Sequence, residues 1–220
     1  MISVAIDGPV GAGKSTVARA AAERMNFIYC DTGALYRAVG LYCKRNGVDM
    51  HDPSSIAVAM SDIKLDIRLA EGAQRIYLNG EDVSDEIRLP EISMAASVVS
   101  PVPEVRAAIL VLERDIAEKN NVIMDGRDIG TVVLPNADVK IFLTAEPEIR
   151  AKRRYEELVA KGKDVTFEEV LSDLNQRDYN DSHRAAAPLR QAADAVLADT
   201  SGMDLEQSVD LVCGLIKERL

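Results

Sequence analysis

Gly8-Pro-Val-Gly-Ala-Gly-Lys-Ser15 matches G-x-x-x-x-G-K-[ST], the pattern of a phosphate-binding loop. The apolar run at residues 2–6 precedes it and reads as a buried strand, and residues 15–25 follow with the composition of a helix. In this context backbone N–H groups and the helix N-terminus both favour a bound anion. A glycine turn that binds nothing is the alternative, and the complete motif in this setting argues strongly against it. We therefore expect the chain to bind a nucleoside triphosphate.

Two side chains of the loop add chemistry that glycines lack. Lys14 is expected to reach the β- and γ-phosphates, and the Ser15 hydroxyl is expected to hold Mg²⁺. The residues expected to bind ATP are Gly8, Pro9, Val10, Gly11, Ala12, Gly13, Lys14, Ser15 and Thr16. Mg²⁺ is thus the expected cofactor, with ATP as the phosphoryl donor.

Size and composition bound the class of protein. A chain of 220 residues suits one α/β domain with an insertion, or two small domains. Its three cysteines are far apart in the sequence and lack C-x-x-C spacing, so they predict neither a disulfide framework nor a zinc site. No apolar run approaches the ~18 residues that cross a bilayer, and the first one is too short for a signal peptide. The net charge of −10 argues against non-specific nucleic-acid binding. We expect a cytoplasmic monomer without nucleic-acid or membrane partners.

Strands alternate with helices along most of the chain. Core strands are expected at residues 2–6, 27–30, 121–125, 139–144 and 195–198. Helices are expected at residues 15–25, 31–44, 91–119 with a break near Pro101 and Pro103, 147–161, 166–183 and 204–219. This alternation predicts an α/β fold of three layers with a five-stranded parallel sheet, in which ligands bind at the carboxyl ends of the strands.

Residues 61–90 interrupt this alternation. Residues 63–69 and 74–78 alternate apolar and polar side chains, with Glu71-Gly72 between the two runs and Asn79-Gly80 after them. Such runs, separated by turn residues, predict a small antiparallel hairpin module inserted into the parallel fold.

Polar residues follow the second and third predicted strands. They are Asp31, Thr32, Tyr36 and Arg37 after the second, and Asp125, Arg127 and Asp128 at the end of the third. Asp125 is placed to enter the Mg²⁺ shell as a Walker-B acid does, and a role as a helix or turn cap is its serious alternative. For Arg127 alone, a solvated loop arginine is the better interpretation.

Two groups of arginines share helix faces. Their members are Arg150, Arg153 and Arg154 in one predicted helix, and Arg177 and Arg184, with Asp181 between them, in the next. Clustered arginines suit a clamp on transferring phosphoryl charge. On surface helices such groups are usually solvated ion pairs worth little, so spacing alone leaves both interpretations open.

Six segments taken together are far more specific than the loop alone. They lie at residues 7–16, 31–37, 80–88, 125–131, 177–184 and 187–189. Their sequences, such as D-T-G-A-L-Y-R at 31–37 and R-D-Y-N-D-S-H-R at 177–184, resemble the bacterial cytidylate kinase family along nearly the whole chain. The hairpin module corresponds to the enlarged nucleoside-monophosphate domain of that family, which other nucleoside-monophosphate kinases lack.

The resemblance implies a P-loop kinase with three parts. The core kinase domain is expected at residues 1–36 and 105–220, the nucleoside-monophosphate-binding domain at 37–104, and a short helical lid within the core at 148–165. The implied reaction transfers the γ-phosphate of ATP to CMP or dCMP, giving CDP or dCDP and ADP, in pyrimidine nucleotide metabolism.

The resemblance also assigns residues. Those implied to bind CMP are Thr32, Arg37, Arg127 and Arg184 at the phosphate, Ser97, Arg106 and Asp128 at cytosine, and Arg177 with Asp181 at the sugar, with Tyr36 added to this set. Those implied in catalysis are Lys14, Arg127 and the lid arginines Arg150, Arg153 and Arg154, which would close over the γ-phosphate.

The implied base reading agrees with hydrogen-bond chemistry. Asp128 can accept from the cytosine 4-amino group, and Arg106 can donate to ring N3 or the carbonyl. Uracil would place a carbonyl against the Asp128 carboxylate, and this unpaired contact supplies discrimination. Thr32 departs from the serine commoner in the family but keeps the hydroxyl. His183 lies inside a motif without an assignable role.

Other functions remain as alternatives. The nearest is a P-loop kinase for another acceptor, such as UMP, AMP or a small alcohol. A GTPase-type switch is a second, because Asn175-Gln-Arg-Asp178 faintly resembles the guanine-reading N-K-x-D. That segment has glutamine in place of the lysine and lies within a predicted helix, which argues against the switch. A purely structural protein is a remote third possibility.

Overall fold

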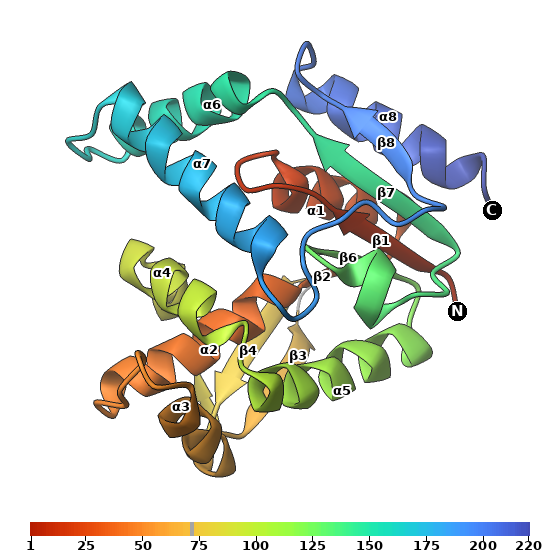
Figure 1. Cartoon of the computed structure of the whole chain (residues 1–220). Helices are drawn as coiled ribbons and strands as arrows, with labels where there is room; N and C mark the ends of the chain where they lie inside the picture. The colour runs from red at the N-terminus through yellow and green to blue at the C-terminus, as the bar shows by residue number, and fades with distance from the viewer. Residues whose placement is uncertain (71–72) are drawn as a thin grey trace. The chain divides into compact units, whose positions relative to one another are not determined.

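Two sheets organise the described residues, which are 1–70 and 73–220 of a computed structural model. One is a five-stranded parallel sheet in the order β2-β6-β1-β7-β8, and the other is a three-stranded antiparallel sheet in the order β3-β4-β5 (Figure 1). The strands are β1 Ser3–Asp7, β2 Ile28–Asp31, β3 Leu65–Ala70, β4 Ala73–Leu78, β5 Glu81–Asp82, β6 Val122–Gly126, β7 Val139–Thr144 and β8 Val196–Asp199. The α/β P-loop fold with its five-stranded sheet and antiparallel module is confirmed.

Most helices begin and end close to their predicted bounds. They are α1 Lys14–Met25, α2 Thr32–Arg45, α3 Pro53–Ala59, α4 Pro90–Val99, α5 Pro103–Lys119, α6 Pro147–Ala160, α7 Phe167–His183 and α8 Leu205–Lys217. Short helical turns are η1 Met60–Asp62 and η2 Glu86–Arg88, and η3 Ile129–Val133 is a π-helix. The helix predicted at 91–119 is divided at Pro101 and Pro103, as expected, and α3 and η3 were not predicted.

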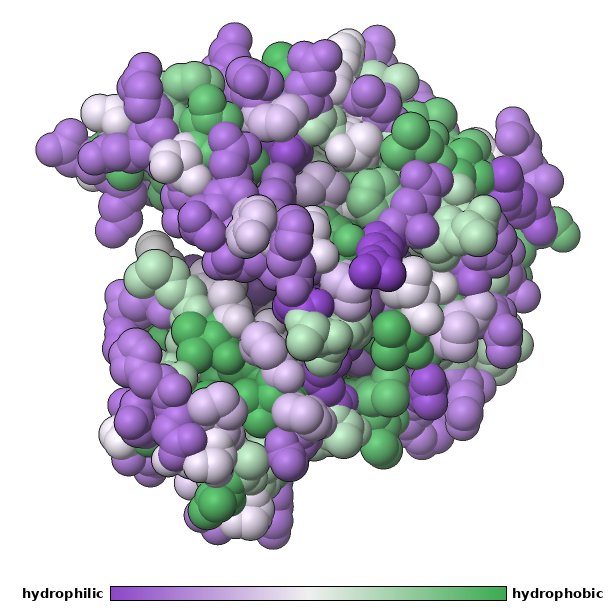
Figure 2. All heavy atoms as spheres, viewed as in Figure 1, coloured by the Kyte–Doolittle hydropathy of each residue, from purple (hydrophilic) through white to green (hydrophobic). Residues whose placement is uncertain are grey.

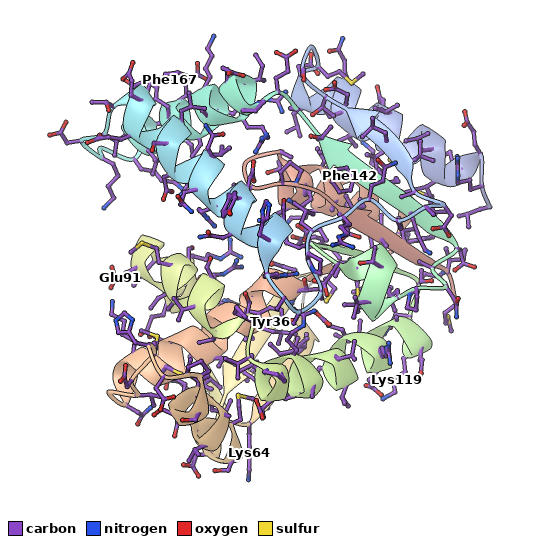
Figure 3. The ribbon with its side chains drawn as sticks, in the orientation of Figure 1. Tyr36, Lys64, Glu91, Lys119, Phe142 and Phe167 are labelled. Atoms are coloured by element: carbon purple, nitrogen blue, oxygen red, sulfur yellow. The ribbon has the colours of Figure 1, made fainter. Side chains whose placement is uncertain are left out.

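Side-chain caps explain where several helices begin. Asp31 accepts from the backbone N–H of Ala34 at 3.1 Å and so starts α2. A capping box begins α7, because Thr166 and Glu169 each accept from the other's backbone N–H. Phe167, labelled in Figure 3, packs edge-on against Tyr155 of α6 with ring centroids 6.4 Å apart. The start of α7 is therefore fixed by both polar and apolar contacts.

Packing divides the described chain into two units. One comprises Met1 and residues 28–120, and the other comprises residues 2–27 and 121–220. These boundaries come from packing, whereas the functional boundaries at 36/37 and 104/105 stay a prediction.

The unit of residues 28–120 has its own apolar core. Helices α2, α4 and α5 and strand β4 contribute fully buried side chains such as Leu35, Ile76, Ile92 and Ile109. Helices α2 and α4 approach closely at Gly40, where an added Cβ would lie 2.9 Å from the Ala95 Cβ. The predicted turn at Asn79-Gly80 joins β4 to β5 with φ of 52° and 89°, the left-handed pair that such hairpins use. The other predicted turn, Glu71-Gly72, lies outside the described residues.

The second unit centres on β1. This strand pairs with β6 and β7, with Ile6 opposite Asp125 and Ile141, and its residues from Val4 to Asp7 are buried. Strands covered on both faces carry continuous apolar runs, as this one does. Helices α1 and α8 pack together, and so do α6 and α7. The carboxyl end of β1 leads at Asp7 into the glycine-rich loop.

Cys30, Cys43 and Cys213 are all buried as thiols. Hydrophilic side chains cover much of the face seen in Figure 2. In residues 1–70 and 73–220 no single helix is long and apolar enough to cross a membrane, and Glu91–Val99 with Pro103–Lys119 would reach that length only across a bend of 102°.

Candidate functional site

The glycine-rich loop joins β1 to α1 and has a backbone that only glycine adopts easily. Gly11 and Gly13 have φ of 74° and 81°, and Gly8 has φ of 152°. An added Cβ on Gly8 would lie 2.0 Å from the Leu143 carbonyl oxygen, so the loop passes directly against β7. Gly13 stands at the N-terminus of α1, whose N–H groups point towards the loop. The local geometry is that of an anion-binding cradle.

Lys14 is buried beneath this loop, with 5% of its surface exposed. Its Nζ donates to the Pro9 carbonyl at 2.8 Å. Burial and, next to it, the charge of the neighbouring Arg127 guanidinium lower the pKa of Lys14 to about 7, while Asp125 and Asp7 oppose the shift. A phosphate beside this ammonium would favour its charged form.

Ser15 in the first turn of α1 meets Asp125 near the carboxyl end of β6. The Ser15 Oγ donates to the Asp125 Oδ2 at 2.8 Å, and Asp125 is buried. A hydroxyl and a carboxylate are the hard oxygen ligands that Mg²⁺ prefers. The described residues contain no group of three or more His, Cys, Asp or Glu side chains arranged to hold a metal ion by themselves. The pair therefore fits an ion that takes its other ligands from phosphate oxygens and water.

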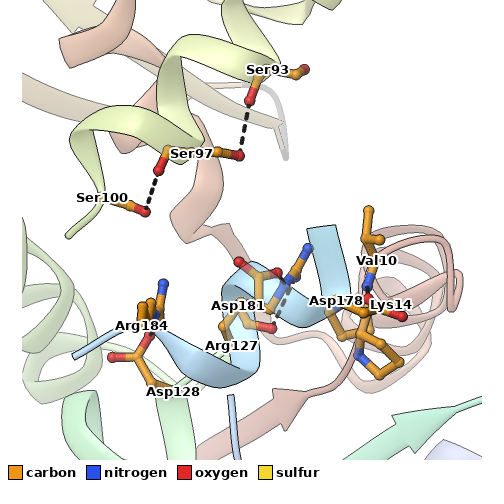
Figure 4. A network of polar contacts seen from close by, with 12 residues as sticks. Val10, Lys14, Ser93, Ser97, Ser100, Arg127, Asp128, Asp178, Asp181 and Arg184 are labelled. Atoms are coloured by element: carbon orange, nitrogen blue, oxygen red, sulfur yellow. Dashed lines mark hydrogen bonds and ion pairs between the residues drawn. The ribbon is translucent and has the colours of Figure 1, made fainter. Parts of the chain in front are cut away.

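The segment after β6 pairs with α7 (Figure 4). Arg127 Nε donates to Asp181 Oδ2 at 2.7 Å, and Arg184 Nη2 donates to Asp128 Oδ1 at 2.8 Å. The side chains of Asp128 and Arg184 are 8% and 9% exposed, so this ion pair is largely removed from water. Four predicted residues from two distant stretches of sequence thus come together.

Arg177 lies near the same group. Desolvation lowers the pKa of its guanidinium, and the charge of Arg127 adds to that effect. Two guanidinium groups that repel one another in a partly buried position are stabilised by an anion between them. The arrangement suits a phosphate.

The three arginines predicted to lie in a lid have different partners among the residues that the structure describes. Arg150 is buried and donates to the carbonyls of Ala145 and Val10 and to the Asp178 carboxylate. Arg153 Nη2 donates to the carbonyls of Thr200 and Met203, 2.7 and 3.1 Å away. Arg154 pairs with Glu157 on the surface of α6.

The remaining predicted residues lie in the unit of residues 28–120. Thr32 is buried at the start of α2, and Arg37 Nη2 donates to Asp31 Oδ2 at 2.7 Å. The Arg37 Nε is buried and has no hydrogen-bond partner among the described residues.

Helix α2 also carries Tyr36, which is labelled in Figure 3. The Arg106 guanidinium carbon lies 5.9 Å from the centre of the Tyr36 ring. Arg106 Nη1 donates to the Ser100 carbonyl at 3.4 Å. The Ser100 hydroxyl in turn donates to the Ser97 carbonyl at 3.3 Å (Figure 4). Within this unit, Tyr36, Ser97 and Arg106 thus form one connected group.

Asp7 is a buried residue for which the sequence predicts no role. Its two carboxylate oxygens accept from the backbone N–H groups of Ile129 and Gly130, both at 2.7 Å. Burial raises the pKa of Asp7 to about 6, although these hydrogen bonds lower it. Asp7 holds the start of η3, directly after Asp128. Its place immediately before the loop was the one available sequence signal.

Comparison with known proteins identifies what this chain resembles. The family described as cytidylate kinase matches residues 4–218. A cytidylate kinase of Caldicellulosiruptor bescii is 47% identical over 214 residues, which are 97% of this chain and 95% of that protein. One from Pelotomaculum thermopropionicum is 50% identical over 214 residues, 96% of this chain and 93% of that protein. A solved structure of an uncharacterized protein from Eubacterium ventriosum covers 100% of both chains with a TM-score of 0.55 and 14% identity, a likeness of fold alone.

Proposed function

Because the chain belongs to the cytidylate kinase family, we propose that it transfers the γ-phosphate of ATP to CMP or dCMP. The products are ADP and CDP or dCDP, and the reaction belongs to pyrimidine nucleotide metabolism. One structural observation above all supports the donor half of this proposal. Lys14 is buried beneath a left-handed glycine loop, beside a contacting Ser15–Asp125 pair.

On the donor side, residues 8–16 bind the triphosphate of ATP. Backbone N–H groups of the loop and the start of α1 contact the phosphates, and the Lys14 ammonium neutralises charge on the β- and γ-phosphates. Ser15, with Asp125 beside it, holds Mg²⁺, directly or through water. Held there, Mg²⁺ would withdraw charge from the phosphate groups of ATP.

On the acceptor side, arginines bind the CMP phosphate and two further residues read the base. Arg127 pairs with Asp181 of α7 and its charge acts on Arg177 of the same helix. Arg184, directly after α7, pairs with Asp128, the neighbour of Arg127 in the sequence. This grouping supports a shared anion site. Asp128 accepts from the cytosine 4-amino group, and Arg106 donates to the ring. The remaining residues assigned to CMP are Thr32, Tyr36, Arg37, Ser97 and Asp181.

The chemistry needs no general base. A CMP phosphate oxygen is already anionic at neutral pH and attacks the γ-phosphorus, forming an O–P bond while the bond to the β-phosphate oxygen breaks. ADP leaves as the anion. The protein contributes alignment and stabilisation of charge by Lys14 and the arginines.

Of the lid arginines, Arg154 best fits a clamp on the γ-phosphate. It pairs with Glu157 in an exposed ion pair, which contributes little and is readily exchanged for a phosphate. Arg150 and Arg153 donate to backbone carbonyls that they would have to leave. We keep all three as candidates and rank Arg154 first.

The deciding experiment is a coupled assay of ADP release with a panel of acceptors. CMP and dCMP should support turnover in the presence of ATP and Mg²⁺, and UMP and AMP should support much less. Equal rates with AMP or UMP would contradict the assignment of the acceptor. Nucleotide hydrolysis that ignores every acceptor would favour a switch protein instead.

The same assay tests the donor site. Lys14→Ala should lower turnover by at least about 100-fold, because one cationic contact to the transferring phosphate is lost. Lys217→Ala, which truncates an exposed lysine in the last turn of α8, is the control. Near-normal turnover in a folded Lys14→Ala protein would remove the loop from catalysis. A cytoplasmic location and a monomeric state remain predictions of the sequence.

A further inference from the structure

Asp178 on α7 contacts the tip of the phosphate loop at Val10 (Figure 4). It also pairs with Arg150 in the first turn of α6. Its Oδ1 accepts from the backbone N–H of Val10 at 3.1 Å, and its Oδ2 accepts from Arg150 Nη1 at 2.6 Å. The same Nη1 donates to the Val10 carbonyl at 2.8 Å. One ion pair therefore holds both backbone polar groups of Val10.

This ion pair is itself rigidly supported. The Arg150 side chain is 5% exposed, and its Nε donates to the Ala145 carbonyl at 2.8 Å. The Asp178 side chain is partly buried, with 21% of its surface exposed. A buried guanidinium with several hydrogen bonds loses little further freedom, so it provides a fixed point for the loop.

Apolar contacts place the loop tip at the same point. Val10 packs against the cluster of Ala151, Val170 and Leu174 from α6 and α7. An added Cβ on Gly11 would lie 3.1 Å from Leu174 Cδ1. The tip of the loop thus rests on α6 and α7 through side chains of both kinds.

We propose that Asp178 is a positioning residue for ATP, which orders the loop tip at residues 9–11 by holding Val10 directly and through Arg150. A loop without such partners has to be ordered when the triphosphate binds, and that conformational entropy opposes binding. Asp178 removes this cost in advance. In this arrangement Arg150 donates a hydrogen bond to the loop backbone at Val10. The carboxylate of Asp178 balances the positive charge of Arg150.

The inference rests on the proposed phosphotransferase function but concerns one side of it. Helix α7 also carries Arg177 and Asp181, and Arg184 follows directly as its C-cap; all three are assigned to CMP. A general disturbance of α7 would weaken both substrates, whereas loss of loop order should weaken ATP alone. The two substrates therefore have to be measured separately.

The test compares Asp178→Ala and Asp178→Asn in the full chain. Equilibrium binding of ATP without acceptor should weaken by about tenfold in Asp178→Ala, because two donors lose a charged acceptor. Asp178→Asn should lose less, since its amide oxygen still accepts from Val10. The KM for CMP at saturating ATP should stay at the wild-type value in both.

Glu168→Gln is the matched control, because it removes one negative charge from an exposed position of the same helix. It should leave ATP binding unchanged. Thermal melting establishes that each variant is folded, and Asp178→Asn carries the test if Asp178→Ala is not. Wild-type ATP affinity in folded Asp178 variants, or equal losses for ATP and CMP, would overturn the assignment.

A double-mutant cycle with Arg150→Met tests the route of the effect. If Asp178 acts partly through Arg150, the losses of ATP affinity from Asp178→Asn and Arg150→Met should be less than additive. Additive losses would contradict that route. ATP binding is measured without CMP, so a wild-type protein that binds ATP but does not phosphorylate CMP would refute the proposed acceptor and leave this inference standing.

Discussion

At the scale of single residues, Lys14 is an ionisable amine that the fold removes from water. Its Nζ donates to one carbonyl, and its pKa is lowered from 10.5 to about 7, mainly by burial. A buried ammonium destabilises the protein without nucleotide, and a bound phosphate relieves this. The site is thus adapted to its ligand at the expense of the unliganded state.

This burial predicts a dependence of stability on pH. Between about pH 7 and about pH 10.5 the unfolded chain keeps a proton on Lys14 that the folded chain has lost, so stability rises with pH over that range. Below about pH 7 the charged, buried form is present and the destabilisation is complete. Lys14→Met should therefore stabilise the nucleotide-free protein more near neutral pH than in alkali. Urea unfolding of both proteins across this range measures the difference, and a pH-independent difference would contradict it.

Asp128 is the residue on which base selection is expected to depend. Asp128→Asn keeps the size of the side chain but gives it an N–H donor, which can face the uracil carbonyl. We expect the ratio of kcat/KM for CMP to that for UMP to fall by at least about tenfold. The ion pair with Arg184 is also lost, so melting temperatures are compared first. An unchanged ratio in a folded variant would remove Asp128 from base reading.

At the scale of elements, the phosphate loop depends on its contact with β7. Gly8→Ala would place a Cβ 2.0 Å from the Leu143 carbonyl oxygen, at a φ of 152° that other residues rarely adopt. The free energy of unfolding should fall by at least about 2 kcal/mol. Gly214→Ala in α8, where an added Cβ meets nothing within 4 Å, is the control. It should stabilise the protein by up to about 1 kcal/mol, because alanine favours helix. Chemical denaturation measures the free energy of unfolding of both variants. Equal changes in the two would contradict this account of the loop.

The sheet could be predicted from the sequence because its signals are local. The strand expected at 139–144 is β7, since a continuous apolar run marks a strand buried on both faces. Helix α3 was missed, although Asp52 caps it and Pro53 begins it, which is a readable start signal. The π-helix η3 has no such signal, because its bonds from Val133 to Asp128 and from Leu134 to Ile129 follow no common periodicity.

The candidate site was predictable only where one segment contains the chemistry. The sequence of residues 8–15 alone predicts the ATP-binding loop, whereas the CMP-binding residues were predicted from the resemblance to a family. The partners of Arg150 and Arg153 could not be predicted, because Val10 and Thr200 contribute backbone carbonyls from distant parts of the chain. Carbonyls are present at every residue, so a sequence pattern carries no information about which one accepts.

At the scale of the whole molecule, binding of anionic ligands should govern thermal stability. The chain has a net charge of −10, yet Lys14 and Arg177 both have pKa values lowered by burial. A ligand at about 100 times its Kd stabilises the folded state by about 2.7 kcal/mol. For a chain of this size, that corresponds to a rise in Tm of about 5–10 °C. Thermal melting should show this rise in Tm with ATP and Mg²⁺, and in a separate experiment with CMP.

UMP at the same concentration is the control for specificity. It should raise Tm much less than CMP, because its base lacks the amino group that Asp128 is expected to bind. Inorganic phosphate tests the anion effect without a base. Equal rises with CMP and UMP would contradict selection by the base, whatever the rates of turnover.

The rates at which the three buried thiols react with a reagent in solution report on local unfolding of this protein. A thiol reacts as its exposed thiolate, so a reagent in solution modifies Cys30, Cys43 or Cys213 only while the surrounding structure is open. Cys30 and Cys43 belong to the unit of residues 28–120, and Cys213 belongs to the unit that carries the phosphate loop. Labelling rates at individual cysteines would therefore time the opening of each unit separately, in the unmodified chain and without any introduced probe.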